Sequence, residues 1–146
     1  MRNLPRRSVL LVCLPVSIVF CSISGSALQR DSYAGVWTGS YTAANGNKGS
    51  LTYLLSKDQK GQWGGTVKFS NDGGEQSADL KSVRIASGKF SAKIETPDGK
   101  SIVAIEGTFR GNRLDGTYVV SNKESGQKVD GGSWTTEKST ASKARP

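Results

Sequence analysis

The chain of 146 residues contains no histidine, and its two cysteines, Cys13 and Cys21, both lie near the amino terminus. From residue 22 onward there is therefore neither an imidazole nor a thiol. This excludes Ser-His-Asp and Cys-His catalysis, zinc sites with thiolate or imidazole ligands, and covalent haem attachment in that part of the chain. It excludes a disulfide there as well, so the fold and function must rest on other side chains.

A long apolar run is also missing. The one apolar stretch, residues 9–20, is shorter than the roughly 20 residues that span a bilayer. Three arginines precede this stretch, and mostly small residues follow it up to Ala27. A charged, then apolar, then small-residue order is typical of a secretory signal peptide. We expect a signal peptide over residues 1–27 and an exported protein, located in the periplasm or outside the cell.

Cys21 lies at the end of the apolar stretch, where a bacterial lipoprotein carries its lipid-modified cysteine. Lipoprotein signals have a small residue at the position that Phe20 occupies in this chain. A lipid anchor at Cys21 is therefore not expected.

The remainder of the chain has the size of one domain. Removal of 27 residues would leave 119, enough for a modest core, with 17 basic and 12 acidic residues and a net charge of +5. Residues 137–146 lack periodicity and large apolar side chains, which is typical of a disordered tail, here a basic one. We expect a domain over residues 28–136 followed by this tail.

Glycine is abundant and regularly spaced, with 17 glycines after residue 27. Asn-Gly and Asp-Gly pairs supply the positive φ that tight hairpins require. Seven predicted turns divide the chain into eight segments, none of which has a helical pattern. These turns contain Asn45-Gly46, Lys60-Gly61, Asp72-Gly73-Gly74, Ser87-Gly88, Asp98-Gly99, Gly111-Asn112 and Ser125-Gly126.

The segments between the turns alternate apolar and polar side chains with period two, which indicates strands with one buried face. The fourth segment breaks phase at Leu80, which indicates a bulge. Short hairpins between one-sided strands predict an antiparallel meander. We expect an all-β fold, namely an antiparallel eight-stranded up-and-down meander barrel, with a two-sheet β-sandwich as the alternative.

Nine of the ten aromatic residues after residue 27 fall on the predicted inner face, the exception being Tyr33 at the entry to the domain. Such rings can line a cavity for a small apolar or aromatic ligand, with phenol and indole groups to orient it. They can equally fill the interior, because an eight-stranded barrel is either packed or holds one small ligand. The candidate ligand-binding residues are Trp37, Tyr41, Tyr53, Trp63, Tyr118 and Trp134.

Glycine–aromatic motifs recur along the domain. They are Gly35-Val36-Trp37-Thr38-Gly39, Gly107-Thr108-Phe109, Leu114-Asp115-Gly116-Thr117-Tyr118 and Gly132-Ser133-Trp134. Over residues 33–136 this pattern resembles the small exported bacterial β domains of calycin-like shape, the broad group that includes avidins and lipocalins. The resemblance implies a barrel, and many members of the group have no assigned function. The biotin-contacting residues of avidins do not match position by position, so no site residue is carried over.

Carboxylates are the only groups left for acid–base catalysis. Glu106 and Asp115 lie in neighbouring segments but fall on the predicted outer face, while Asp79 and Asp130 lie near strand breaks. The glycine-rich segments lack the phosphate-binding spacing, and residues 71–75 are too few for a calcium loop. We expect no catalytic residue, no metal and no cofactor; a carboxylate hydrolase is the least favoured interpretation.

The leading functional hypothesis is thus a non-catalytic binding module that holds a small, partly apolar ligand among the inner aromatic residues. The alternative is a cell-envelope interaction protein, or an inhibitor of a secreted enzyme, that acts through its outer surface and loops. Its basic surface suits an anionic envelope polymer, and a nucleic-acid partner is not expected of an exported protein. The outward Val36, Leu54 and Val119 leave the oligomeric state open.

Overall fold

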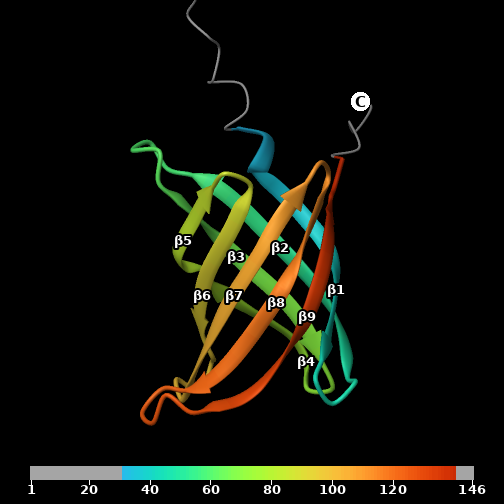
Figure 1. Cartoon of the computed structure of the whole chain (residues 1–146), viewed down its shortest axis with the longest axis vertical. Coiled ribbons are helices and arrows are strands. Elements are labelled where there is room, and N and C mark those ends of the chain that lie inside the picture. The colour runs from blue at the N-terminus through green and yellow to red at the C-terminus, as the bar shows by residue number, and fades with distance from the viewer. Residues whose placement is uncertain (1–30, 141–146) are drawn as a thin grey trace, which may run out of the picture.

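The computed structural model describes residues 31–140; the predicted signal peptide, Cys21 and most of the predicted tail lie outside the described residues. In the described part, one short 3-10 helix precedes nine β-strands, and all strand pairs are antiparallel. The elements are η1 (Asp31–Tyr33), β1 (Gly35–Ala43), β2 (Lys48–Lys57), β3 (Trp63–Asn71), β4 (Gly74–Asp79), β5 (Lys81–Ala86), β6 (Lys89–Glu95), β7 (Ser101–Arg110), β8 (Arg113–Asn122) and β9 (Lys128–Lys138) (Figure 1).

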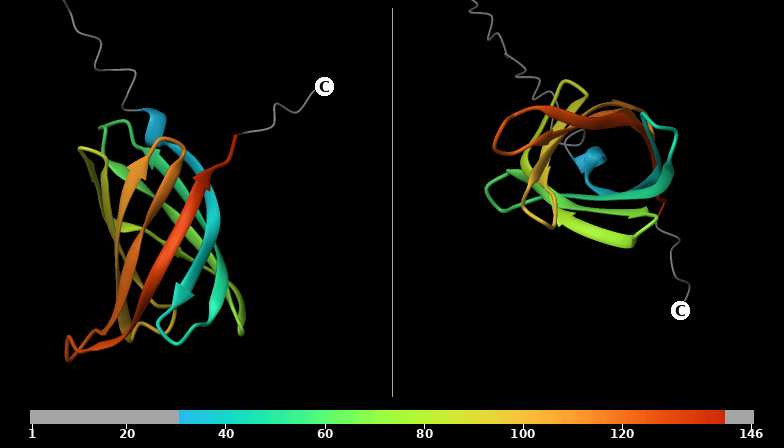
Figure 2. Two further views of the ribbon diagram at one scale, coloured as in Figure 1. Left: turned by 45° about the vertical axis from the view of Figure 1, so that its right-hand side comes forward. Right: turned by 90° about the horizontal axis from the view of Figure 1, so that it is seen from below.

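The nine strands form one sheet in the order β4-β3-β2-β1-β9-β8-β7-β6-β5. The first and last strands are neighbours, since β1 pairs with both β2 and β9. The sheet is strongly curled, so that its strands surround a common interior (Figures 1 and 2). The all-β antiparallel prediction is therefore confirmed, and the strands lie in a single sheet and not in the two sheets of a sandwich.

The predicted eight strands are nine because the fourth segment is divided at Leu80. Its first half, β4, pairs with β3, and its second half, β5, pairs with β6. The buried Leu80 lies between them, and its N–H donates to the Gly65 carbonyl at 2.9 Å. Ser82 has a φ of 52°, and the β5–β6 register shifts between Lys81 and Arg84. The predicted irregularity is present, and it is the point where the chain passes from one neighbouring strand to the other.

Each of the seven predicted turns contains a glycine with positive φ, which lets consecutive strands reverse direction tightly.

The inner face of the curled sheet carries the core. Tyr33, predicted to be the one aromatic residue away from the interior, packs against the core, because η1 folds over one end of the sheet. The buried members of the core are Trp37, Leu51, Tyr53, Leu55, Val67, Leu80, Phe90, Ala92, Ile94, Ile105, Phe109, Leu114 and Trp134.

A glycine on the inner face, Gly107, makes room for Trp134. Gly107 of β7 lies opposite Gly116 of β8, and Gly116 lies opposite Trp134 of β9. A Cβ atom on Gly107 would lie 2.8 Å from two carbons of the indole ring. The indole N–H donates to the Thr117 carbonyl at 3.1 Å. The absent side chain at Gly107 therefore leaves room for the indole ring, whereas the absent side chain at Gly116 lets the backbone of β7 approach closely.

Strand β9 extends to Lys138, two residues past the predicted end of the domain at residue 136. The Lys138 N–H donates to the Asn112 carbonyl at 2.7 Å, and the Ser139 N–H donates to the Val36 carbonyl at 2.8 Å. The start of the predicted tail is thus part of the sheet. Within residues 31–140, no helix has the length and apolarity needed to cross a bilayer.

Candidate functional site

One end of the curled sheet, here called the closed end, is covered by aromatic rings. Tyr33 of η1 lies 4.2 Å from Phe109 and 6.5 Å from Trp63, measured between ring centroids. Trp37 packs edge-on against Phe109 at 5.1 Å, and its indole N–H donates to the Tyr33 carbonyl at 3.0 Å. Viewed along the sheet, η1 lies across the space that the strands surround (Figure 2). Stacked rings therefore close this end.

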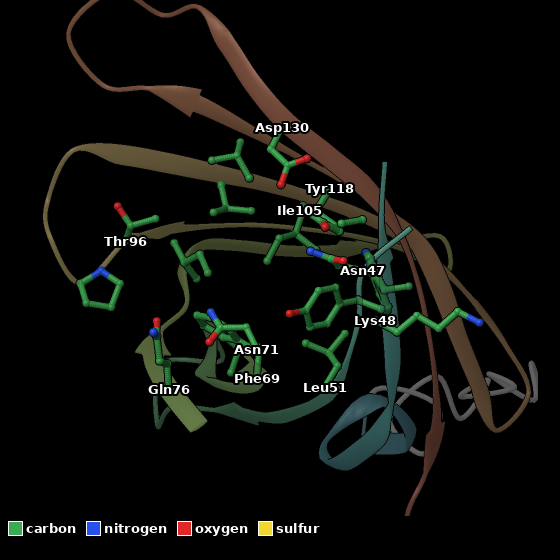
Figure 3. Close-up of a pocket in the computed structure, with 18 of the residues that line it drawn as sticks. Asn47, Lys48, Leu51, Phe69, Asn71, Gln76, Thr96, Ile105, Tyr118 and Asp130 are labelled. Carbon is green, nitrogen blue, oxygen red and sulfur yellow. The ribbon is translucent and has the colours of Figure 1, made fainter. Parts of the chain in front are cut away.

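The opposite end, here called the mouth, is hollow. A cavity of about 530 Å³ opens there among the β1–β2, β3–β4 and β6–β7 turns (Figure 3). Its volume lies within the range of small-molecule sites, about 300–1,000 Å³. Besides tyrosine and tryptophan residues, the apolar part of its wall consists of Ala43, Leu51, Val67, Phe69, Ile94, Pro97, Val103, Ile105 and Val120.

Four of the six predicted ligand-binding residues line this cavity: Tyr41, Tyr53, Tyr118 and Trp134. Tyr41 and Tyr118 meet edge-on at 6.1 Å, and Tyr53 and Trp134 meet edge-on at 5.0 Å. The Tyr41 hydroxyl donates to the Ser70 carbonyl at 2.8 Å, which fixes this ring at the rim. Strands β1, β2, β8 and β9 thus bring these four rings together.

The other two predicted residues, Trp37 and Trp63, belong to the closed end and do not line the cavity. Trp37 is 1% exposed, and its ring lies 5.8 Å from the Lys138 ammonium. The ring of Trp63 lies 4.7 Å below the Lys57 ammonium, within the range of a cation–π contact. These two indoles therefore pack and cover the end of the core.

Tyr53 is the most enclosed polar side chain of the cavity wall, at 1% exposure. Its ring packs edge-on against Phe90 and Trp134. Burial strongly raises the pKa of its phenol, so the hydroxyl stays protonated and can donate a hydrogen bond. Within residues 31–140 the hydroxyl has no hydrogen-bond partner. Its oxygen keeps a small accessible surface. Because Tyr53 lines the cavity, this hydroxyl is a hydrogen-bond donor available to a ligand there.

The rim of the cavity is polar and mainly acidic. Burial raises the pKa of Tyr41, and the negative charges of Asp72 and Asp130 raise it further. Burial also raises the pKa of Tyr118, with further contributions from Asp130 and Tyr41. The charged residues of the cavity wall are Lys48, Asp72, Glu95, Asp98 and Asp130, and the uncharged polar ones are Asn45, Asn47, Asn71, Gln76 and Thr96.

The sequence pattern does not distinguish these rim residues as parts of a site. The pattern predicts a turn at Asp72 and a strand break near Asp130, and both predictions are correct locally. The order of the turns could have indicated them. Successive strands of a meander run in opposite directions, so every second turn lies at the same end. The turns near residues 45, 72 and 98 therefore share one end, together with the start of the last strand.

The remaining carboxylates considered above lie away from the cavity. Asp115 lies on the outer face, 3.3 Å from Arg113 and 3.7 Å from Arg110, and Glu106 is exposed. Neither Glu106 nor Asp79 lines the mouth. Within residues 31–140, no three carboxylates, cysteines or histidines are grouped so that they could hold a metal ion.

Comparison with known proteins adds no assignment. No protein-family model matches the chain, and no curated protein matches it. The cavity and its wall are therefore the features that bear on function.

Proposed function

We propose that the protein is an exported, non-catalytic binding module that holds a small, partly apolar ligand in the cavity at the mouth. The observation that carries the proposal is a cavity of about 530 Å³ whose wall combines apolar side chains with Tyr41, Tyr53, Tyr118 and Trp134. Small-molecule sites are typically concave and mostly apolar, with a few polar groups that orient the ligand.

The proposed architecture is a closed up-and-down barrel of calycin-like shape with eight wall segments. In this view β4 and β5 count as one segment, because only Leu80 separates them. This segment pairs with β3 through β4 and with β6 through β5. The two edges of the sheet are thereby joined through the chain itself. A closed wall would keep water from reaching the ligand from the side and would leave the mouth as its entrance.

The size of the cavity sets the affinity to be expected. A ligand of about 15–20 non-hydrogen atoms, at about 0.3 kcal/mol per atom, binds with about 5–6 kcal/mol, which corresponds to a Kd of about 0.1 mM. A screen of apolar and aromatic compounds at millimolar concentration is therefore sensitive enough. Binding is followed by tryptophan fluorescence and by the thermal unfolding midpoint.

The decisive variant is Val120→Trp, which places an indole into the cavity. We expect it to abolish binding of any compound found in the screen while the protein stays folded. Val119→Trp is the matched control. Val119 precedes Val120 in β8, points to the outer face and is absent from the cavity wall. Equal loss of binding in both variants would contradict a site in the cavity.

The tryptophans provide an internal check on the location of the ligand. Trp134 lines the cavity, whereas Trp63 lies at the closed end. Ligand-induced fluorescence changes should persist in Trp63→Phe and disappear in Trp134→Phe. If apolar compounds, sugars and cofactors all leave the native protein unchanged, the proposal fails. The outer face, where Val36 and Leu54 are paired and exposed, then becomes the surface to study.

A further inference from the structure

The charge of the cavity wall is opposite to that of the chain. Basic residues outnumber acidic ones in the whole sequence, 20 to 12, yet the wall has four carboxylates and one lysine. At physiological ionic strength the Debye length is about 8 Å, so nearby carboxylates act on a bound ligand more strongly than distant surface lysines do. A ligand in the mouth therefore meets an acidic environment on a basic protein.

Two of the four carboxylates already have partners. Glu95 forms ion pairs with Lys123 at 2.6 Å and with Lys81 at 3.3 Å. Asp98 accepts hydrogen bonds from the Thr96 hydroxyl at 2.6 Å and from the Lys100 N–H at 3.1 Å. The contacts of Glu95 link the end of β6 to Lys123 in the β8–β9 turn, whereas those of Asp98 lie within its own turn.

Asp72 and Asp130 remain available. Within residues 31–140 neither forms an ion pair, and Asp130 accepts one hydrogen bond, from the Gly131 N–H at 2.7 Å. In Figure 3, Asp130 and Tyr118 lie on the same side of the cavity, whereas the Lys48 side chain extends away from it. The rim thus presents two uncompensated negative charges beside the Tyr41 and Tyr118 rings.

A metal ion does not suit this rim. The carboxylates of the described residues are not grouped as metal ligands. An organic ammonium needs no such cage, because one carboxylate and an aromatic ring are enough to stabilise it. The apolar wall below the rim requires an apolar body attached to that cation.

The deep part of the wall adds a second requirement. Tyr53 is 1% exposed, and its hydroxyl has no hydrogen-bond partner within residues 31–140. A polar group in an apolar surrounding is costly unless it forms a hydrogen bond. A ligand atom that accepts this hydrogen bond would remove that cost.

We propose, on the basis of the proposed function, that the ligand is a cationic amphiphile. Its ammonium group lies between Asp72 and Asp130, and its apolar or aromatic body fills the cavity. An oxygen or nitrogen at its buried end accepts a hydrogen bond from Tyr53.

The test compares three probes that share one apolar body: phenylbutylammonium, phenylbutanol and phenylbutyrate. We expect the purified protein to bind the ammonium about tenfold more tightly than the alcohol, and the carboxylate least tightly. Added salt should weaken binding of the ammonium and leave the alcohol unaffected. Failure of all three to bind contradicts the proposed function, whereas equal binding of all three contradicts only the cationic ligand class. Tighter binding of the carboxylate also overturns that class.

Variants locate the preference for the cation. In the double variant Asp72→Asn, Asp130→Asn we expect the ammonium and the alcohol to bind equally, with binding of the alcohol unchanged. Both side chains are exposed, so the fold should tolerate the change. Glu124→Gln is the control, because Glu124 lies in the turn after β8 at the same end but does not line the cavity. If Glu124→Gln weakens ammonium binding as much, general electrostatic attraction and not this rim is responsible.

Tyr53→Phe tests the buried contact. The native protein should bind para-hydroxyphenylbutylammonium several-fold more tightly than phenylbutylammonium, and the variant should lose that difference. Without ligand, Tyr53→Phe should unfold at the same temperature as the native protein or at a higher one, because it removes an unpaired hydroxyl. A lower unfolding temperature would show that the hydroxyl is already satisfied, and it would overturn this part of the proposal.

Discussion

The two ends of the curled sheet differ in what fills them, although the same strands supply both. At the closed end the inward residues are large, with Trp37, Phe109 and Leu114 packed beneath Tyr33. At the mouth β1 and β8 carry the small inward residues Ala43 and Val120 beyond the rings of Tyr41 and Tyr118, and a cavity remains. Since the strands alternate in the same way at both ends, alternation alone does not determine where the interior is solid.

Equal truncations at the two ends should reveal this difference most strongly. Leu114 lies at the closed end and is 0% exposed. Leu114→Ala should lower the free energy of unfolding by about 3–5 kcal/mol, because it leaves a new void. Leu51→Ala, in the cavity wall, should cost about 1–2 kcal/mol less, since the space beside Leu51 is already open. Urea unfolding measures both values. Equal losses would mean that the mouth is as tightly packed as the closed end.

The packing of Trp134, a residue of the cavity wall, can be tested at Gly107. Gly107→Ala should cost about 1–3 kcal/mol, because the added methyl group would lie 2.8 Å from the indole ring and force it to move. Gly64→Ala is the control: nothing lies within 4 Å of its Cβ position and its φ is ordinary. We expect Gly64→Ala to leave the free energy of unfolding unchanged or to raise it by about 0.5 kcal/mol. A tolerated Gly107→Ala would show that the ring of Trp134 is not held against the wall.

Much of the wall could be predicted from local sequence. Alternation within the segments and the turn glycines are local signals, and the break in phase at Leu80 marked the place where the fourth segment divides. The same signals led to an incorrect strand number. Period two does not reveal that one segment pairs first with β3 and then with β6.

The division of the interior could not be predicted, because it depends on contacts between distant strands. Trp37, Trp63 and Trp134 all follow the inward pattern, yet only Trp134 reaches the cavity. Tyr33 precedes the first strand, and its role in closing one end depends on Phe109, which is 76 positions further along the chain. Asp72 and Asp130 likewise share a rim only because the sheet curls.

The two ends should also differ in their response to pH, since exposed ion pairs support the mouth and buried rings support the closed end. Hydrogen bonds from Lys123 and then Lys81 hold the pKa of the Glu95 carboxyl below its usual value of 4.5. Because the pKa is lower in the folded protein, the stabilisation is present above 4.5 and is lost as the pH falls through the folded pKa.

We therefore expect Glu95→Gln to be less stable than the native protein near neutral pH. The loss should be smaller than that of Leu114→Ala or Gly107→Ala, because exposed ion pairs contribute little. The difference should disappear well below pH 4.5 and shrink in high salt. Glu124→Gln, whose side chain forms no ion pair within residues 31–140, should match the native protein throughout. Urea unfolding across this pH range measures the difference. A Glu95→Gln effect that persists in acid would mean that the mouth depends on packing at Glu95, as the closed end does at Leu114, and not on charge.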